Sequence, residues 1–166
     1  MLKITKGDLE LFSRNVIFGV EDSLVSTVGL LSGVAVAGVS RAGIFSTGMI
    51  LIFVEAFSMG VGSFLSESSV EEYEKKKDLL AKPFFGAVVM FISYFLAGLV
   101  PIFPYVFLDK FITEVSVGIT FLALFFLGIF SARFLKINIW RQAIRMVLMG
   151  GAAILVGSVV GNVFKI

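Results

Sequence analysis

The sequence contains no cysteine and no histidine in 166 residues. Without cysteine it can form neither a disulfide nor a thiolate metal site, and it has no nucleophilic thiol. Without histidine it lacks the commonest zinc ligand and the commonest general base. An enzyme of this composition would depend on Asp, Glu, Lys or Ser, and no motif of that chemistry is present. We therefore expect no enzymatic activity, no catalytic residue and no required cofactor.

Charge is also scarce. Asp, Glu, Lys and Arg make up 16% of the chain, the formal net charge is +2, and hydrophobic residues make up 58%. The mean hydropathy is +1.02, so a soluble domain of this length could not bury its apolar surface. The lipid bilayer should therefore be the main partner of the chain. The basic residues occur in short patches between apolar runs, which argues against a nucleic-acid-binding face.

Five segments are long and apolar enough to cross about 30 Å of hydrocarbon at about 1.5 Å per residue. Their approximate bounds are 16–39, 43–66, 83–108, 112–132 and 142–164. The connections are too short to hold a soluble domain. We therefore expect an all-α integral membrane protein, with residues 1–166 forming a single transmembrane domain of five helices.

Residues 7–14 precede the first span and combine apolar and charged side chains. They predict a short interfacial helix lying along the membrane surface. Its lipid-facing residues would be Leu9, Leu11 and Phe12, and its water-facing residues Asp8, Glu10 and Arg14.

Lys and Arg are distributed unevenly between the two sides of a five-span chain. Because positively charged segments stay on the cytoplasmic side, the imbalance predicts the orientation. Arg41, Lys110 and Lys165 fall on one side, and eleven residues fall on the other: Lys3, Lys6, Arg14, Lys75, Lys76, Lys77, Lys82, Arg133, Lys136, Arg141 and Arg145. We predict a cytoplasmic N-terminus and a C-terminus outside the cell or in a lumen.

Three acids fall inside the predicted spans: Glu21, Asp22 and Glu55. A charged side chain near the bilayer centre costs about 2.5 to 3.5 kcal/mol on insertion, so each is a candidate functional residue. Glu21 and Asp22 lie close enough to the interface that one of them could point to water, and Asp22 could be structural. Glu55 lies near mid-span, where its side chain cannot easily reach water.

Helical spacing groups these acids with other polar or small residues. One face of the first helix carries Asp22, Ser26, Gly29, Gly33 and Ala37, and one stripe of the second carries Glu55, Met59, Gly62 and Ser66. Asp22 lies about 9 Å, and Met59 about 10 Å, inside the cytoplasmic ends of their spans, so the two side chains could meet.

The combination of carboxylate, thioether and hydroxyl groups suits Fe²⁺ or Mn²⁺ better than Zn²⁺ or Cu²⁺. Carboxylates also take up protons, so metal movement could be coupled to proton countermovement. A methionine on its own is more often core than ligand, so Met59 could instead fill a gap between helices.

Two further groups have alternative interpretations. The pairs Gly29 with Gly33 and Gly157 with Gly161 are small-xxx-small motifs, which indicate helix packing or dimer contact rather than ligand binding. Glu67, Glu71 and Glu74 share one side of a helical extension after the second span and could collect cations before they cross the membrane. Equally, they could belong to a solvated helix end and pair with Lys75 to Lys77.

The segments GVEDSLVSTVGLLSGVAVAG (19–38) and EAFSMGVGSFLSESSVEEYE (55–74) resemble the vacuolar iron transporter family, also called the Ca²⁺-sensitive cross-complementer family. The resemblance implies a homodimer of five-helix protomers with the ion path between them. It also implies that Asp22 and Met59 line that path, and that Fe²⁺, often with Mn²⁺, leaves the cytosol for a vacuole or the outside in exchange for protons.

The chain departs from the family pattern in two places. Iron-storing plant members have a long insertion between the second and third spans, whereas only about eight polar residues stand here. Their second-span acid corresponds to Leu51, whereas this chain has Glu55. Our leading hypothesis is a divalent-metal transporter of the cell membrane or a vacuole-type membrane. The alternative is a structural or accessory membrane protein that oligomerises through its glycine-rich helix faces.

Overall fold

The structure is a computed structural model that describes residues 6–75 and 80–165, and every regular element in these two ranges is an α-helix. The helices are α1 (Lys6–Val36), α2 (Arg41–Tyr73), α3 (Ala81–Phe107), α4 (Ile112–Leu135) and α5 (Ile139–Val163). All five are long and apolar enough to cross a membrane. The predicted all-α, five-helix, multi-pass fold is confirmed.

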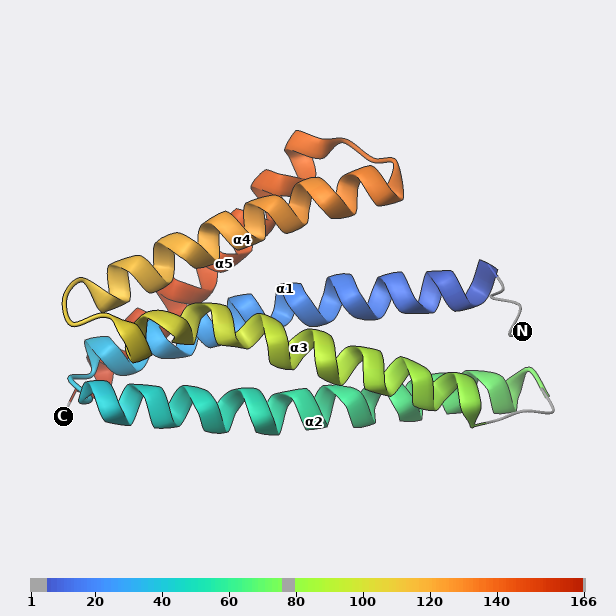
Figure 1. Cartoon of the computed structure of the whole chain (residues 1–166), viewed down its shortest axis with the longest axis horizontal. Helices are drawn as coiled ribbons and strands as arrows, with labels where there is room; N and C mark the ends of the chain where they lie inside the picture. Colours follow the sequence, from blue (N-terminus) through green and yellow to red (C-terminus); the bar gives the residue numbers. More distant parts are fainter. Residues whose placement is uncertain (1–5, 76–79, 166) are drawn as a thin grey trace.

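The helices alternate in direction, so the connections gather at the two ends of the bundle (Figure 1). The start of α1, the end of α2, the start of α3 and the α4–α5 turn lie at one end, which we call the basic end. It holds Arg14, Lys82, Arg133, Lys136 and Arg141. The α1–α2 turn, the α3–α4 turn and the end of α5 lie at the opposite end. This arrangement matches the grouping of loops from which the orientation is predicted.

The first helix begins earlier than its predicted span, at Lys6 rather than near residue 16. Residues 7–14 are therefore the first turns of α1 and not a separate interfacial helix. Leu9 and Phe12 are exposed, but Leu11 is only 4% exposed and packs at Gly86 of α3, so its predicted place in lipid is wrong. The periodicity marks Leu11 as apolar but cannot show that α3 covers it. The side chain of Asp8 lies outside the described residues.

Helix α3 is the centre of the arrangement. It packs against α1 on one side and α2 on the other, and α1 and α2 touch each other much less than either touches α3. Helix α5 packs along α1 and pairs with α4. Two apolar clusters hold these contacts: Leu31, Ile44, Ile52, Ile102 and Tyr105 join α1, α2 and α3, and Leu24, Ala97, Leu124 and Met146 join α1, α3, α4 and α5.

Arg41 closes the end of α3 that lies opposite the basic end. Its guanidinium donates to the carbonyl oxygens of Tyr105 at 2.7 Å and Val106 at 3.0 Å, and to Asp109 Oδ1 at 2.9 Å. The last carbonyls of a helix have no partner within the helix and carry partial negative charge, so a cation stabilises them. The first residue of α2 therefore fixes the position of α3, which continues past Pro101 and Pro104 to Phe107.

Candidate functional site

Asp22 of α1 and Glu55 of α2 lie near the middle of their helices and are both half-buried. Their carboxylates are close enough to interact electrostatically. Asp22 is more central than the predicted span suggests, because α1 extends about ten residues further toward the basic end. The structure thus brings together two of the three acids that the sequence singles out, and we call Asp22 and Glu55 the carboxylate pair.

Gly98 of α3 allows α1 and α2 to approach each other beside the carboxylate pair. A Cβ atom at Gly98 would collide with the side chain of Ile52 on α2 and would lie 2.8 Å from Ser23 Oγ on α1. Ser23 follows Asp22 directly, and Ile52 lies about one turn before Glu55. Because no side chain fills this part of α3, α1 and α2 come closer together here than a larger residue would permit.

Met59 lies one turn from Glu55 toward the basic end and lines a cavity of about 430 Å³. We call this the Met59 cavity. Its lining comes from α1, α2 and α3: Arg14, Asn15, Phe18, Met59, Gly62, Ser63, Ser66 and Met90. Phe18, which lines the same cavity as Met59, is about one turn from Asp22 along α1, and neither acid of the carboxylate pair lines the cavity. A second thioether, Met90, does.

Glu21 points to a different part of the molecule, as expected for the neighbour of Asp22 on a helix. It lines a cavity of about 750 Å³ between the first half of α1 and the end of α4, together with Arg14 and Lys136. Arg145 of α5 is near enough to attract its carboxylate. The Glu21 carboxylate also interacts electrostatically with that of its neighbour Asp22, but Glu21 lines this cavity and not the one that Met59 lines.

Ser26, one turn after Asp22, is hydrogen-bonded to Tyr94 of α3. The two hydroxyl oxygens lie 2.7 Å apart, and Ser23 Oγ donates to the Tyr94 carbonyl at 2.6 Å. Tyr94 is fully buried. It lies near enough to both Asp22 and Glu55 to interact with them electrostatically. Sequence reasoning missed Tyr94, although two adjacent hydroxyl-bearing residues, Ser93 and Tyr94, in the middle of an apolar span were a signal.

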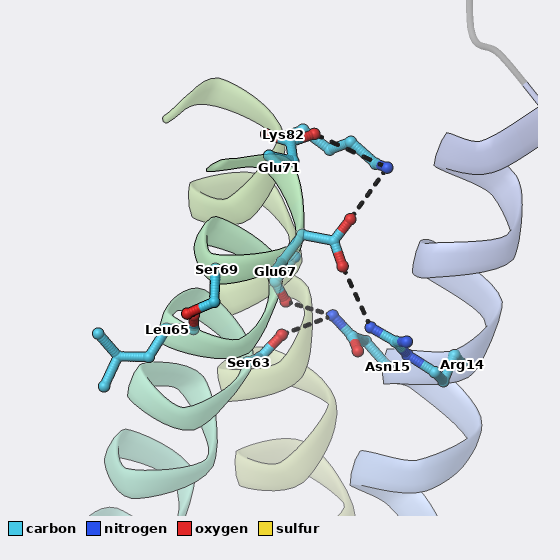
Figure 2. Close-up of polar contacts among 9 residues, drawn as sticks. Arg14, Asn15, Ser63, Leu65, Glu67, Ser69, Glu71 and Lys82 are labelled. Carbon is cyan, nitrogen blue, oxygen red and sulfur yellow. Dashed lines mark hydrogen bonds and ion pairs between the residues drawn. The ribbon is translucent and has the colours of Figure 1, made fainter. Parts of the chain in front are cut away.

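At the basic end, Glu67 and Glu71 are buried, with 8% and 2% of their surfaces exposed. Figure 2 shows Glu67 between two cations: Lys82 Nζ lies 3.0 Å from Glu67 Oε1, and Arg14 Nη2 lies 3.4 Å from Glu67 Oε2. Lys82 is also 3.9 Å from Glu71. These two acids are not part of a solvated helix end. Their described partners come from α1 and α3, whereas Lys76 and Lys77 lie outside the described residues.

Glu74 is exposed near the end of α2, beyond Glu67 and Glu71. The collection of cations by these three acids stays a prediction.

Asn15 joins three helices just below this ion-pair network. Its amide donates to Ser63 Oγ of α2 at 2.9 Å (Figure 2). It also donates to the Gly86 carbonyl of α3 at 2.8 Å. Arg14, Asn15 and Ser63 also line the Met59 cavity. The network therefore lies at the side of the cavity that faces the basic end. Asn15 stands seven residues before Asp22 on the same face of α1, so its helical spacing was a signal for this role.

The four glycines of the small-xxx-small motifs lie between α1 and α5 of the same chain. A Cβ atom at Gly33 would lie 2.7 Å from the Gly157 carbonyl oxygen, and one at Gly157 would overlap the Gly29 carbonyl. A Cβ atom at Gly161 would likewise overlap the Gly33 carbonyl. These glycines let the two helix backbones touch.

Within residues 6–75 and 80–165, no three Asp or Glu side chains gather closely enough to hold a metal ion. The carboxylate pair offers two acidic groups, and the nearest thioether, Met59, is one turn away.

Comparisons with known proteins agree with this architecture. The sequence model of the VIT family matches residues 13–80 and 70–162. A protein of Oryza sativa subsp. japonica named Vacuolar iron transporter 1 is 23% identical over an alignment of 202 positions, gaps included, which spans 84% of this chain and 80% of the rice protein. The family match includes both segments that carry the candidate site and extends over nearly all of the five-helix bundle. The chain belongs to the VIT family.

Proposed function

We propose that this chain transports Fe²⁺ or Mn²⁺ across a membrane, with Asp22, Glu55 and Met59 as ligands along the ion path. The observation that carries the proposal is the carboxylate pair, two acids held half-buried and near each other inside membrane-spanning helices. Membership of the VIT family, and a relative named a vacuolar iron transporter, support transport of metal ions.

The physical argument concerns the cost of placing these acids inside the bilayer. Two carboxylates in a region of low dielectric repel each other, and each loses hydration when it leaves water. A divalent cation between them offsets both costs. Met59, one turn closer to the basic end, adds a thioether, which magnesium and calcium do not favour but intermediate transition metals accept. The site thus selects for divalent ions of moderate softness.

A homodimer would complete the coordination shell. One chain offers two carboxylates and one thioether near the path, whereas ions such as Mn²⁺ take six ligands in octahedral geometry. A second copy related by two-fold symmetry would supply the same three groups again. We therefore propose that the path runs between two protomers, with water filling positions that the side chains leave open.

The proposed direction of transport is out of the cytosol. The basic end would face the cytosol by the positive-inside rule, and the Met59 cavity lies on that side of the carboxylate pair. Protons can replace the metal on Asp22 and Glu55, so return of the empty site in protonated form would give proton antiport. The membrane would be a vacuole-type membrane or the cell membrane.

The glycine contacts argue against the alternative of a purely structural protein. That hypothesis needs glycine-rich faces for association between chains, but Gly29, Gly33, Gly157 and Gly161 pack α1 against α5 within one chain. It also leaves the half-buried carboxylate pair without a role.

The test is metal flux into proteoliposomes that enclose a metal-sensitive dye. We expect the wild type to carry Fe²⁺ and Mn²⁺, and Asp22→Asn and Glu55→Gln to lose at least about 90% of that flux, because one neutralised acid removes a charge-assisted ligand. Glu114→Gln is the matched control, since Glu114 is an exposed acid in the first turn of α4. Equal flux in the wild type, Asp22→Asn and protein-free vesicles would overturn the proposal.

A further inference from the structure

Tyr94 of α3 forms hydrogen bonds with two residues of α1, Ser23 and Ser26, which are about one helical turn apart. Ser23 Oγ donates to its backbone carbonyl at 2.6 Å, and its hydroxyl oxygen lies 2.7 Å from Ser26 Oγ. Ser23 and Ser26 are the first and fourth residues after Asp22. The contacts therefore hold the segment of α1 that carries Asp22 against α3.

One assignment of donors satisfies both contacts that the Ser26 hydroxyl makes. Ser26 Oγ lies 3.5 Å from the Ser23 carbonyl oxygen, where only the serine can donate. Both contacts are satisfied when Tyr94 donates to Ser26 and Ser26 donates onward to the Ser23 carbonyl. A serine oxygen has two lone pairs, so Ser26 keeps one of them. The phenol thereby sets the orientation of an oxygen that lies one turn from Asp22.

The burial of Tyr94 makes this hydroxyl costly to leave without a partner. The side chain is fully buried, and most of the neighbouring residues in α3 are apolar and offer the hydroxyl no partner. A phenylalanine would fill nearly the same volume and would need no hydrogen bond. The carboxylates of Asp22 and Glu55 are the charged groups within electrostatic reach of the phenol. The Tyr94 hydroxyl therefore lies where α3 meets the segments of α1 and α2 that carry the carboxylate pair.

We infer that Tyr94 is a positioning residue of the ion path, which holds Asp22 opposite Glu55 by fixing Ser23 and Ser26. This inference rests on the proposed function. Helices α1 and α2 each contact α3 much more than they contact each other, so the distance between the two acids depends on how α3 holds each helix. Gly98, one turn after Tyr94, admits Ile52 of α2 and Ser23 of α1 to the same place. Tyr94 and Gly98 together therefore set the width of the site.

The experiment compares Tyr94→Phe with Tyr105→Phe in the proteoliposome flux assay, with the metal concentration varied. Tyr105 is a matched control, because it is also buried on α3 and its hydroxyl has one partner, Thr113 Oγ1 at 3.2 Å, far from the carboxylate pair. We expect Tyr94→Phe to raise the metal concentration for half-maximal flux by about 2- to 10-fold, the effect of one lost hydrogen bond. Tyr105→Phe should leave it unchanged.

Ser26→Ala provides a second measurement on the same contact. It removes the partner of the Tyr94 hydroxyl, so we expect an increase of similar size, and the double variant should show no more than the larger single effect. Independent effects that multiply would show that the two hydroxyls do not act together and would overturn the inference.

The outcomes separate this inference from the proposed function. If the wild type carries metal but Tyr94→Phe, Tyr105→Phe and the wild type share one half-maximal concentration, Tyr94 has no positioning role and the transporter stands. If the wild type carries no metal, the proposed function fails and the inference falls with it. Thermal unfolding of Tyr94→Phe and Tyr105→Phe in detergent should shift equally, so that a change in flux reports on the site and not on stability.

Discussion

Lys82 Nζ lies 3.0 Å from Glu67 Oε1, and this ion pair joins the end of α2 to the start of α3. The two residues are 15 positions apart in the sequence, across the connection between the two helices. The Glu67 side chain is 10% exposed and that of Lys82 is 26% exposed, so water screens the pair only partly. The contact closes the α2–α3 hairpin next to the Met59 cavity.

We predict that Glu67→Gln destabilises the protein by about 1 to 3 kcal/mol, because it removes a charged acceptor from a buried network. Unfolding in mixed micelles with increasing denaturing detergent measures the change. Glu72→Gln, at an exposed acid five residues further along α2, should shift the midpoint by less than about 0.5 kcal/mol. Equal shifts for the two variants would mean that the ion pair contributes nothing.

The glycines between α1 and α5 give a second prediction about stability. Gly33→Ala places a methyl group 2.7 Å from the Gly157 carbonyl oxygen, so the helix backbones must move apart. We expect a loss of about 1 to 3 kcal/mol, the usual cost of overpacking a tight contact.

Gly118→Ala on α4 is the matched control for this substitution. A Cβ atom at Gly118 would meet nothing within 4 Å, so alanine there should stabilise the helix by about 0.5 to 1 kcal/mol. The predicted changes in the free energy of unfolding therefore have opposite signs: Gly33→Ala should lower it and Gly118→Ala should raise it. A stabilised Gly33→Ala protein would contradict the close approach of α1 and α5.

The two thioethers of the Met59 cavity lead to a prediction about selectivity. Met59→Leu keeps the volume but removes the sulfur, which is a softer ligand than oxygen. We expect Fe²⁺ flux to fall by about threefold relative to Mn²⁺ flux, which corresponds to a difference of about 0.7 kcal/mol in ligand preference. Competition between the two metals in proteoliposomes measures the ratio.

Met49→Leu provides the control for the loss of sulfur. Met49 lies on the same helix but packs against the apolar cluster around Ile52 and Ile102, away from the Met59 cavity. Its substitution should leave the metal ratio unchanged. A shift of the ratio in Met49→Leu, or none in Met59→Leu, would mean that the thioether does not discriminate between the ions.

The number and type of helices could be predicted from the sequence, because the length of an apolar run is a direct measure of its ability to cross a bilayer. The acids inside the spans were identifiable for the same reason, since Asp22 and Glu55 interrupt such runs. What could not be predicted was which helices are neighbours. In an apolar chain, a lipid-facing side chain and one that faces another helix have the same polarity. The pattern therefore predicts that Leu11 faces lipid, although it packs against α3.

The central place of α3 explains what else was missed at the site. The pattern of the first two spans indicated that α1 and α2 share a site, but it did not show that α3 lies between them. Tyr94 and Lys82 of α3 contact Ser26 of α1 and Glu67 of α2, which the sequence singles out, and Met90 of α3 lines the same cavity as Met59. Tyr94 lies 68 positions from Ser26 and Lys82 lies 15 from Glu67, and no local spacing rule connects residues so distant in the chain.

The carboxylate pair predicts opposite changes in the stability of the metal-free and the metal-loaded protein. Without metal, two like charges share a partly dehydrated place, so Asp22→Asn or Glu55→Gln should stabilise the protein slightly, by up to about 1 kcal/mol. With metal at about 100 times its dissociation constant, a binding site should stabilise the wild type by about 2.7 kcal/mol, and the same variants should lose most of that gain. Thermal unfolding in detergent with and without Mn²⁺ measures both effects.

Protons compete with metal for the same oxygens of Asp22 and Glu55, so the stabilisation by metal should shrink as the pH falls. Glu114→Gln should behave as the wild type in every condition. If the neutral variants were destabilised without metal and still protected by it, the acids would be structural groups rather than ligands.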